Sequence, residues 1–511
     1  MSQPTASNSS ARSRWWIFAA LILLMASLAL TTRSFWLDET YSARFAEQST
    51  PAACWHLLRE IKGSDPQMPL YIAWLWAVEK VVGHQEIALR AVNLFWFVPA
   101  LVVLLRTLAG NRSLQLTIFG AAIVSPFAWY YLNEARAYTM QFSTSLVLFA
   151  LIGHWARQTD FSATKERGHV RLFCIALFCL CGSSLLSMVL ATAPLLVLLV
   201  LVPLKSLRQL GNQFWVSLAV TSAALVALGI YYLWTLHSGD RATGIAGTDW
   251  RNAAFIAYEL FGVSGLGPGR MAIRSGGGGL ETFRSFAPIL LLFAATAAAL
   301  LFLAAVDLKK NLGTKKLALL FLSVALPVGL LLAASHAMHF RILGRHFAAM
   351  WPVAVLLLGL GLATAWRRGK LGKILACSFV GLYLASALSL RFAMRHEKDD
   401  YRGAANVAKA ALAEGKSVWW NADRNSALFY QVPLANGQTQ ANAAAWLANP
   451  DTQSIANARP DVIITTRPDA YDDRGGIREL VREGHYQLAT NLTAFQIWRR
   501  IAVDSPPSQS K

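Results

Sequence analysis

The stretch RSFWLDETYSARF (Arg33–Phe45) decides how the chain is interpreted, because it places two adjacent carboxylates directly after the first long apolar run. The carboxylates are Asp38 and Glu39. The aromatic side chains around them are Phe35, Trp36 and Tyr41. Tryptophan and tyrosine concentrate where membrane hydrocarbon meets water. We therefore expect this pair of acids to lie at the surface of a membrane.

The composition predicts a polytopic membrane protein. Of the 511 residues, 55% are hydrophobic and only 15% are charged. A soluble protein carries about a quarter charged residues, so we expect an all-α bundle of membrane helices. A net charge of +19 would point to nucleic acid in a soluble protein. Here the cations lie mostly in short loops between apolar runs, which favours membrane lipid headgroups over nucleic acid as their partner.

Membrane helices are expected wherever about 20 apolar residues follow one another. This criterion gives about eleven spans, near residues 15–32, 87–106, 113–132, 138–156, 172–187, 189–204, 214–236, 287–306, 317–334, 347–366 and 374–390. The basic loops all fall on one side of the membrane if residues 172–204 cross it twice. Because basic loops favour the cytoplasmic side, this places the N-terminus in the cytoplasm and the segment after residue 390 outside. A single helix at 172–204 would reverse every later loop.

The other segments complete the predicted organisation. Residues 1–14 and 504–511 are expected to be disordered, and residues 15–390 to form the transmembrane domain. Two long outward loops interrupt that domain, at 33–86 and 237–286. The second loop contains the run RSGGGGLETF, which favours a linker over a closing lid. Residues 391–503 alternate helical patterns with strand-like runs at 417–420, 461–466 and 494–498, which predicts a small outward α/β domain.

The adjacent acids Asp38 and Glu39 allow two interpretations. Neighbouring side chains diverge by about 100° on a helix, so one carboxylate can face a pocket as a catalytic base while the other supports the structure. The alternative is an ordinary solvated helix cap at the membrane surface.

The second short outward loop, YYLNEARAY (Tyr130–Tyr138), carries Glu134 and Arg136 just beyond a span. The functional interpretation is an arginine that holds an anion near the outer leaflet. The alternative is an aromatic belt with a surface ion pair.

A third charged loop, HAMHFRILGRH (His336–His346), precedes the span at residue 347. Its arginines, including Arg345, run against the positive-inside rule, and a lipid phosphate is the natural ligand for them. His336 and His339 have a spacing that metal ligands use, but no carboxylate lies near them in the sequence. We interpret them as histidines at the rim of the site.

Four motifs, in this order, resemble the GT-C superfamily of polyprenyl-phosphate-sugar glycosyltransferases. They are WLDE (36–39), DPQMPLYIAWLW with GHQEIALR (65–90), NEARAY (133–138) and GRHFAAMWP (344–352). The most similar branches are the protein O-mannosyltransferases and the bacterial aminoarabinose transferases that act on lipid A. Two departures stand out, since Gln67-Met68 replaces the usual His-Pro and Arg345-His346 replaces the usual Arg-Tyr.

The resemblance implies an inverting glycosyltransferase of the bacterial inner membrane. It would move a sugar from a polyprenyl-phosphate donor to a lipid, glycan or protein acceptor at the periplasmic face. Asp38, with Glu39 as second choice, is the implied catalytic base. The implied substrate-binding residues are Asp65, Tyr71, Glu134, Arg136, Tyr138, Arg345 and His346. No cofactor is required and no metal ligand is assigned, although a divalent ion at Asp65 and Glu134 stays open.

Two other classes of function stay open as well. A transporter or flippase of a lipid-linked saccharide tends to place charges and broken helices near the bilayer midplane, whereas the acids here lie at outward helix ends. A non-catalytic membrane scaffold would depend on its C-terminal domain. Deletion of residues 400–511 is expected to abolish all function if the protein is a scaffold, whereas an enzyme would keep its catalytic activity.

Overall fold

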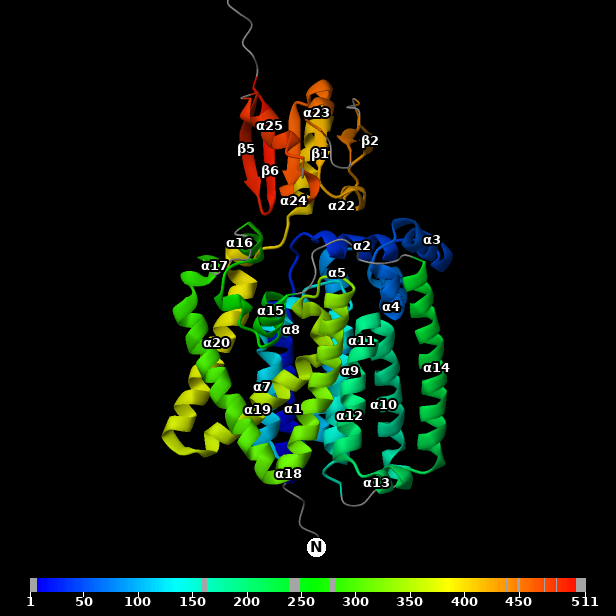
Figure 1. Ribbon diagram of the computed structural model, residues 1–511, viewed down its shortest axis with the longest axis vertical. Coiled ribbons are helices and arrows are strands. Elements are labelled where there is room, and N and C mark those ends of the chain that lie inside the picture. Colours follow the sequence, from blue (N-terminus) through cyan, green and yellow to red (C-terminus); the bar gives the residue numbers. More distant parts are fainter. Residues whose placement is uncertain are drawn as a thin grey trace, which may run out of the picture. The chain divides into compact units, whose positions relative to one another are not determined.

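A computed structural model describes residues 7–158, 163–238, 249–275, 281–437, 440, 442–447, 451–472, 474–483 and 485–501. The chain divides into two compact units (Figure 1). The helical unit comprises Met1–Thr31 and Phe45–His396, and the sheet unit comprises Thr32–Arg44 and Glu397–Lys511. The acid segment, residues Thr32–Arg44, therefore belongs to the same unit as the distant C-terminal sheet.

The described part of the helical unit is built from α-helices and short 3₁₀ turns. These are α1 (Ser7–Ala29), α3 (Pro51–Ile61), η1 (Asp65–Gln67), α4 (Pro69–Val82), α5 (Glu86–Ala91), α6 (Leu94–Thr107), α7 (Arg112–Ile123), α8 (Pro126–Leu132), α9 (Tyr138–Trp155), α10 (Ala163–Ser183), α11 (Leu185–Leu190), α12 (Thr192–Leu201), α13 (Leu204–Gln209), α14 (Asn212–His237), α15 (Trp250–Leu260), η2 (Ser264–Leu266), α16 (Arg270–Ser275), α17 (Glu281–Arg284), α18 (Ala287–Ala337), η3 (Gly344–Met350), α19 (Trp351–Arg367), α20 (Gly369–Phe392) and η4 (Met394–His396).

Within the described residues, five helices are long and apolar enough to cross a membrane, and the bent pair α7–α8 makes a possible sixth. The five are Glu86–Thr107, Phe214–His237, Ala287–Ala337, Gly344–Arg367 and Gly369–Phe392. The third, α18, is interrupted at Gly313, where φ is 79°. The predicted spans 287–306 and 317–334 lie on its two arms. A polytopic helical membrane protein is thus confirmed, and the number of eleven spans stays a prediction.

The helix pair that decides the predicted topology is divided at Ser184. This residue is extended, with φ −171° and ψ 146°, and its hydroxyl accepts a hydrogen bond from the Leu186 amide. Helix α10 therefore ends at Ser183, and α11 and α12 form a second apolar segment. This division agrees with the prediction of two helices in place of one.

The first helix begins earlier than predicted. Helix α1 includes residues 7–14, ahead of the predicted start of the first span at residue 15. The predicted loops 33–86 and 237–286 also contain several helices. Residues 1–6, the tail 504–511 and the glycine run Gly276–Gly279 lie outside the described residues.

Helix α9 forms the centre of the helical core. Every residue from Tyr138 to Ile152 is buried, and the helix contacts α6, α10, α12 and α19. The hydroxyl of Ser145 donates to the Ala349 carbonyl at 2.6 Å, which joins α9 to η3. The loop before Tyr138, which carries two of the predicted site residues, is therefore anchored to the most buried helix of the unit.

The sheet unit contains a mixed six-stranded sheet of order β2-β3-β1-β4-β6-β5. Strands β1, β2, β3 and β4 pair in parallel, whereas β6 is antiparallel to both β4 and β5. The acid segment contributes helix α2 (Leu37–Ala46). The other described elements of the sheet unit are α21 (Tyr401–Ala413), β1 (Val418–Asn421), α22 (Arg424–Phe429), β2 (Leu434–Asn436), β3 (Ala444–Trp446), α23 (Thr452–Ala458), β4 (Val462–Thr466), α24 (Pro468–Tyr471), α25 (Gly476–Arg482), β5 (Tyr486–Leu492) and β6 (Phe495–Arg500).

Both faces of this sheet are covered. Trp420 packs with the alanine face of α21, and Trp419 packs with residues of α23 and α25 on the other side. All four residues of β1 are buried, as expected for a parallel strand between two helical layers. The three predicted strand runs coincide with β1, β4 and β6, which confirms the α/β character of the C-terminal region.

Candidate functional site

The acid segment leads into α2, and the two acids occupy the first turn of that helix. Carboxylates are favourable there because helix N-termini carry partial positive charge. The Glu39 amide donates to the Trp36 carbonyl at 2.9 Å, and the Trp36 amide donates to Glu39 Oε2 at 3.4 Å. Asp38 is half-buried, whereas Glu39 is fully buried. The two neighbouring carboxylates therefore have different surroundings.

Glu39 forms a buried ion pair with Lys398. Glu39 Oε2 lies 3.5 Å from Lys398 Nζ, and the two side chains are 0% and 8% exposed. A buried charge needs a partner of this kind, because the loss of hydration is costly. Glu39 thus has the surroundings of a structural acid, and Asp38 is the acid that keeps access to solvent.

The acid segment is hydrogen-bonded to the N-cap and first turn of α22, which follows β1. Thr40 Oγ1 and Ser426 Oγ lie 2.7 Å apart, and the Tyr41 hydroxyl donates to Asp423 Oδ2 at 2.9 Å. Asp423 also caps α22 by accepting from the Ser426 amide at 2.7 Å. Burial raises the pKa of Asp423, although these hydrogen bonds oppose the rise. The carboxyl end of a parallel strand, where α/β proteins commonly bind ligands, here holds the acid segment.

A second cation of the sheet unit lies near Asp38. Arg467 follows β4 directly and has an unusual φ of 43°. Its Nη2 lies 3.1 Å from Asp399 Oδ2, and both side chains are largely buried. Burial lowers the pKa of Arg467, but the charges of Asp399 and Asp38, among others, raise it above its ordinary value. Neither Lys398 nor Arg467 belongs to a predicted motif, although the position of Arg467 directly after a predicted strand was a usable signal.

In the helical unit, Asp65 and Arg136 form a buried ion pair. Asp65 Oδ1 lies 2.5 Å from Arg136 Nη1, and the side chains are 12% and 6% exposed. The loop of Arg136 is held by Asn93, whose Nδ2 donates to the carbonyls of Leu132 and Glu134 at 3.0 and 2.7 Å. The structure therefore brings together two predicted site residues from distant motifs.

A second polar cluster surrounds Tyr130 at the end of α8. The guanidinium of Arg270 lies 4.4 Å from the centre of the Tyr130 ring, and its Nη2 lies 2.9 Å from Glu259 Oε1. The charges of Glu134 and Arg345 also act on the Tyr130 hydroxyl. Glu134 and Arg345 belong to predicted motifs, whereas Glu259 and Arg270 lie on α15 and α16, in the predicted loop 237–286, which has no recognisable motif.

The remaining predicted residues are buried or half-buried. Tyr71 is 1% exposed on α4, and Tyr138 is 5% exposed. The Tyr138 ring lies 4.9 Å from that of Tyr131, so it belongs to the same aromatic group as the cluster around Tyr130. His346 accepts a hydrogen bond from the Leu343 amide at 3.2 Å, which stabilises the turn before α19. Direct contact of these side chains with a substrate stays a prediction.

Side chains of the kinds that bind metal ions come together elsewhere in the helical unit. Among the described residues, His154, Glu166 and His169 form a group of three side chains that are close enough together to share a metal ion. The histidines His336 and His339 are not part of such a group.

The arrangement of a long helical unit with a small C-terminal sheet has a counterpart of known structure. The fold is similar to that of ArnT from Cupriavidus metallidurans. The crystal structure of ArnT in the apo state matches 96% of this chain and 99% of its own, with a TM-score of 0.52 and 12% sequence identity. The structure of ArnT bound to undecaprenyl phosphate matches the same shares, with a TM-score of 0.50 and 11% identity. No protein-family model and no curated protein matches the sequence.

Proposed function

We propose that this protein is an inverting glycosyltransferase that takes a sugar from a polyprenyl-phosphate donor. Its fold is similar to that of ArnT over nearly the whole length of both chains, and ArnT has been crystallised with undecaprenyl phosphate. The four sequence motifs of this chain resemble those of GT-C glycosyltransferases that use polyprenyl-phosphate sugars. The observation that carries the proposal is the pair Asp38 and Glu39, in which one acid is fixed by Lys398 and the other keeps solvent access.

The membrane arrangement that we propose has eleven spans in a bacterial inner membrane. The N-terminus is cytoplasmic and the sheet unit is periplasmic. This orientation follows from the distribution of basic loops, and the division of the chain at Ser184 supports it.

Asp38 is the base of the proposed reaction. It takes the proton from an acceptor hydroxyl while the hydroxyl oxygen attacks the anomeric carbon. The bond between that carbon and the phosphate oxygen of the carrier breaks, and polyprenyl phosphate leaves with the electron pair. One displacement inverts the anomeric centre, and no second carboxylate is needed as a nucleophile. Arg467 stabilises the ionised form of Asp38 by its charge.

The leaving phosphate needs cations rather than an acid, because it is already anionic. Arg136 and Arg345 are the proposed partners, with Arg270 as a third. Arg136 is paired with Asp65, so we expect Asp65 to fix the position of its guanidinium. The acceptor is a lipid, glycan or protein with a free hydroxyl.

The test measures sugar transfer from undecaprenyl-phosphate-linked aminoarabinose, and from other sugars on the same carrier, by the purified protein in detergent micelles. Micelles have no leaflets, so a flippase would form no glycosidic product there. We expect Asp38→Asn to lower kcat by at least about a hundredfold. The matched control is Asp451→Asn, which alters an exposed helix cap of the sheet unit. Transfer by Asp38→Asn at the rate of the control would overturn the role of Asp38, and absence of product with wild type would overturn the function.

A further inference from the structure

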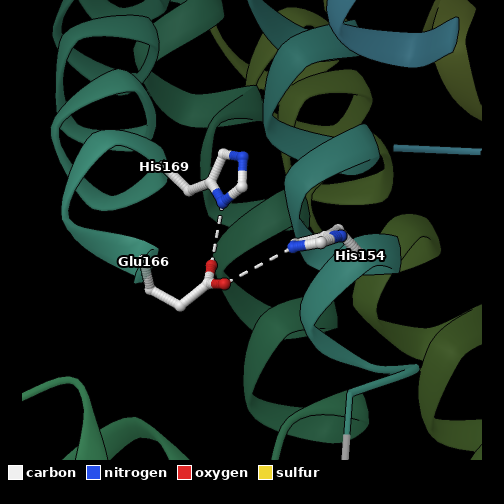
Figure 2. A group of neighbouring side chains, drawn as sticks. All are labelled: His154, Glu166 and His169. Carbon is white, nitrogen blue, oxygen red and sulfur yellow. Dashed lines mark hydrogen bonds and ion pairs between the residues drawn. The ribbon is translucent and has the colours of Figure 1, made fainter. Parts of the chain in front are cut away.

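A cluster of two histidines and one glutamate joins α9 and α10 (Figure 2). His154 is on the last turn of α9, and Glu166 and His169 are three residues apart on α10. Residues at this spacing share one face of a helix. Figure 2 shows the imidazole of His169 above the Glu166 carboxylate and that of His154 to its right, each joined to it by a dashed line.

The distances between the ligand atoms are close to those that a small divalent ion needs. Glu166 Oε2 lies 2.9 Å from His169 Nδ1, and Glu166 Oε1 lies 3.6 Å from His154 Nε2. All three ligand atoms lie within 4.8 Å of one another. A tetrahedral zinc ion with ligands at about 2.1 Å separates them by roughly 3.4 Å, which lies within the 4.8 Å limit for the three ligand atoms.

Neutral donors orient the carboxylate of this cluster. Trp155 Nε1 donates to Glu166 Oε2 at 2.8 Å, and Gln158 Nε2 donates to Oε1 at 2.9 Å. Glu166 is 5% exposed, whereas His154 and His169 are 24% and 39% exposed. Metal ligands typically have outer partners of this kind, and the exposed histidine edges leave a path for the ion.

We propose that His154, Glu166 and His169 bind a divalent transition-metal ion, with zinc as the best match for two imidazoles and one carboxylate. A water molecule takes the fourth position. The site lies at the opposite end of α9 from Tyr138, about 25 Å away for a helix of this length. The ion is therefore separate from the proposed sugar-transfer chemistry, does not depend on that function, and ties α9 to α10.

The experiment uses the full-length protein in detergent, with its affinity tag removed and its metal stripped by a chelator. Zinc or cobalt is added, unbound metal is removed, and the metal content per chain and the cobalt absorption spectrum are recorded. We expect about one ion per chain and an increase in the apparent Tm with zinc. Glu166→Gln, which keeps the shape of the side chain, and His154→Ala/His169→Ala should lose both effects.

The control is His336→Ala/His339→Ala, which removes the other histidine pair and should bind metal like wild type. Elution as a monodisperse peak on size exclusion shows that each variant is folded. If Glu166→Gln is not folded, the His154→Ala/His169→Ala variant decides. Equal metal content in wild type and cluster variants would overturn the proposal, as would a metal-free wild type after zinc addition.

Discussion

Replacing Lys398 by methionine tests whether Glu39 is a structural acid. The change keeps most of the side-chain volume but leaves the Glu39 carboxylate, which is fully buried, without the ammonium group 3.5 Å away. Removing one partner of a buried ion pair costs about 3–5 kcal/mol, mainly because the remaining charge is uncompensated. For a unit of this size, a loss of about 3 kcal/mol lowers the apparent Tm by roughly 10 °C.

The assay combines thermal unfolding of the full-length protein with hydrogen exchange of peptides from residues 32–44. We expect Lys398→Met to speed exchange in this segment. The matched control is Lys416→Met, because Lys416 pairs with Glu414 at an exposed site, with side chains 42% and 59% exposed. Exposed pairs contribute about 0–1 kcal/mol, so the control should change little.

A double variant sharpens the test. Lys398→Met combined with Glu39→Gln removes both charges, and we expect it to recover most of the lost stability, since the uncompensated carboxylate is gone. If Lys398→Met and Lys416→Met have the same stability within about 0.5 kcal/mol, the assignment of Glu39 as a buried structural acid is wrong.

Three further predictions concern other parts of the molecule. Burial, together with a neighbouring arginine, lowers the pKa of His396 to about 4. Because the pKa in the unfolded chain is about 6.5, the free energy of unfolding should fall by about 2 kcal/mol between pH 7 and pH 5. The His396→Gln variant should lose that part of the pH dependence of Tm. A Cβ at Gly361 would lie 2.3 Å from a backbone carbonyl of α18, whereas one at Gly381 meets nothing within 4 Å, so Gly361→Ala should lower Tm and Gly381→Ala should not. Arg467→Gln should lower kcat about tenfold with little change in KM, because it removes a charge near Asp38; an unchanged kcat would count against this role.

The sheet unit also changes how a truncation must be interpreted. Three residues of the sheet unit hold the acid segment by hydrogen bonds. Asp423 bonds Tyr41, Ser426 bonds Thr40, and the Tyr430 hydroxyl accepts from the Phe35 amide. Deleting residues 400–511 would remove all three partners. Loss of activity on deletion is therefore expected for an enzyme as well as for a scaffold, and point variants must separate the two.

The sequence alone determined the class of the protein. Apolar runs of membrane length predict helices whatever their neighbours are, because every backbone polar group in hydrocarbon must be bonded within its own helix. The strand runs around Trp419 and Ile463 were predictable for a similar reason, since their side chains are apolar on both faces of the sheet. Asp38 and Arg136 were identifiable by motif, because both lie directly beside an apolar run.

Only the tertiary structure decided which partners these residues have. Nothing local in the sequence links Glu39 to Lys398, or Asp65 to Arg136, since ion pairs between distant segments depend on how helices and loops pack. The placement of the acid segment in the C-terminal unit was likewise unpredictable, because a hydroxyl such as that of Tyr41 carries no information about the residue it will bond. Local sequence sets which elements form, whereas burial and distance after packing set which charges meet.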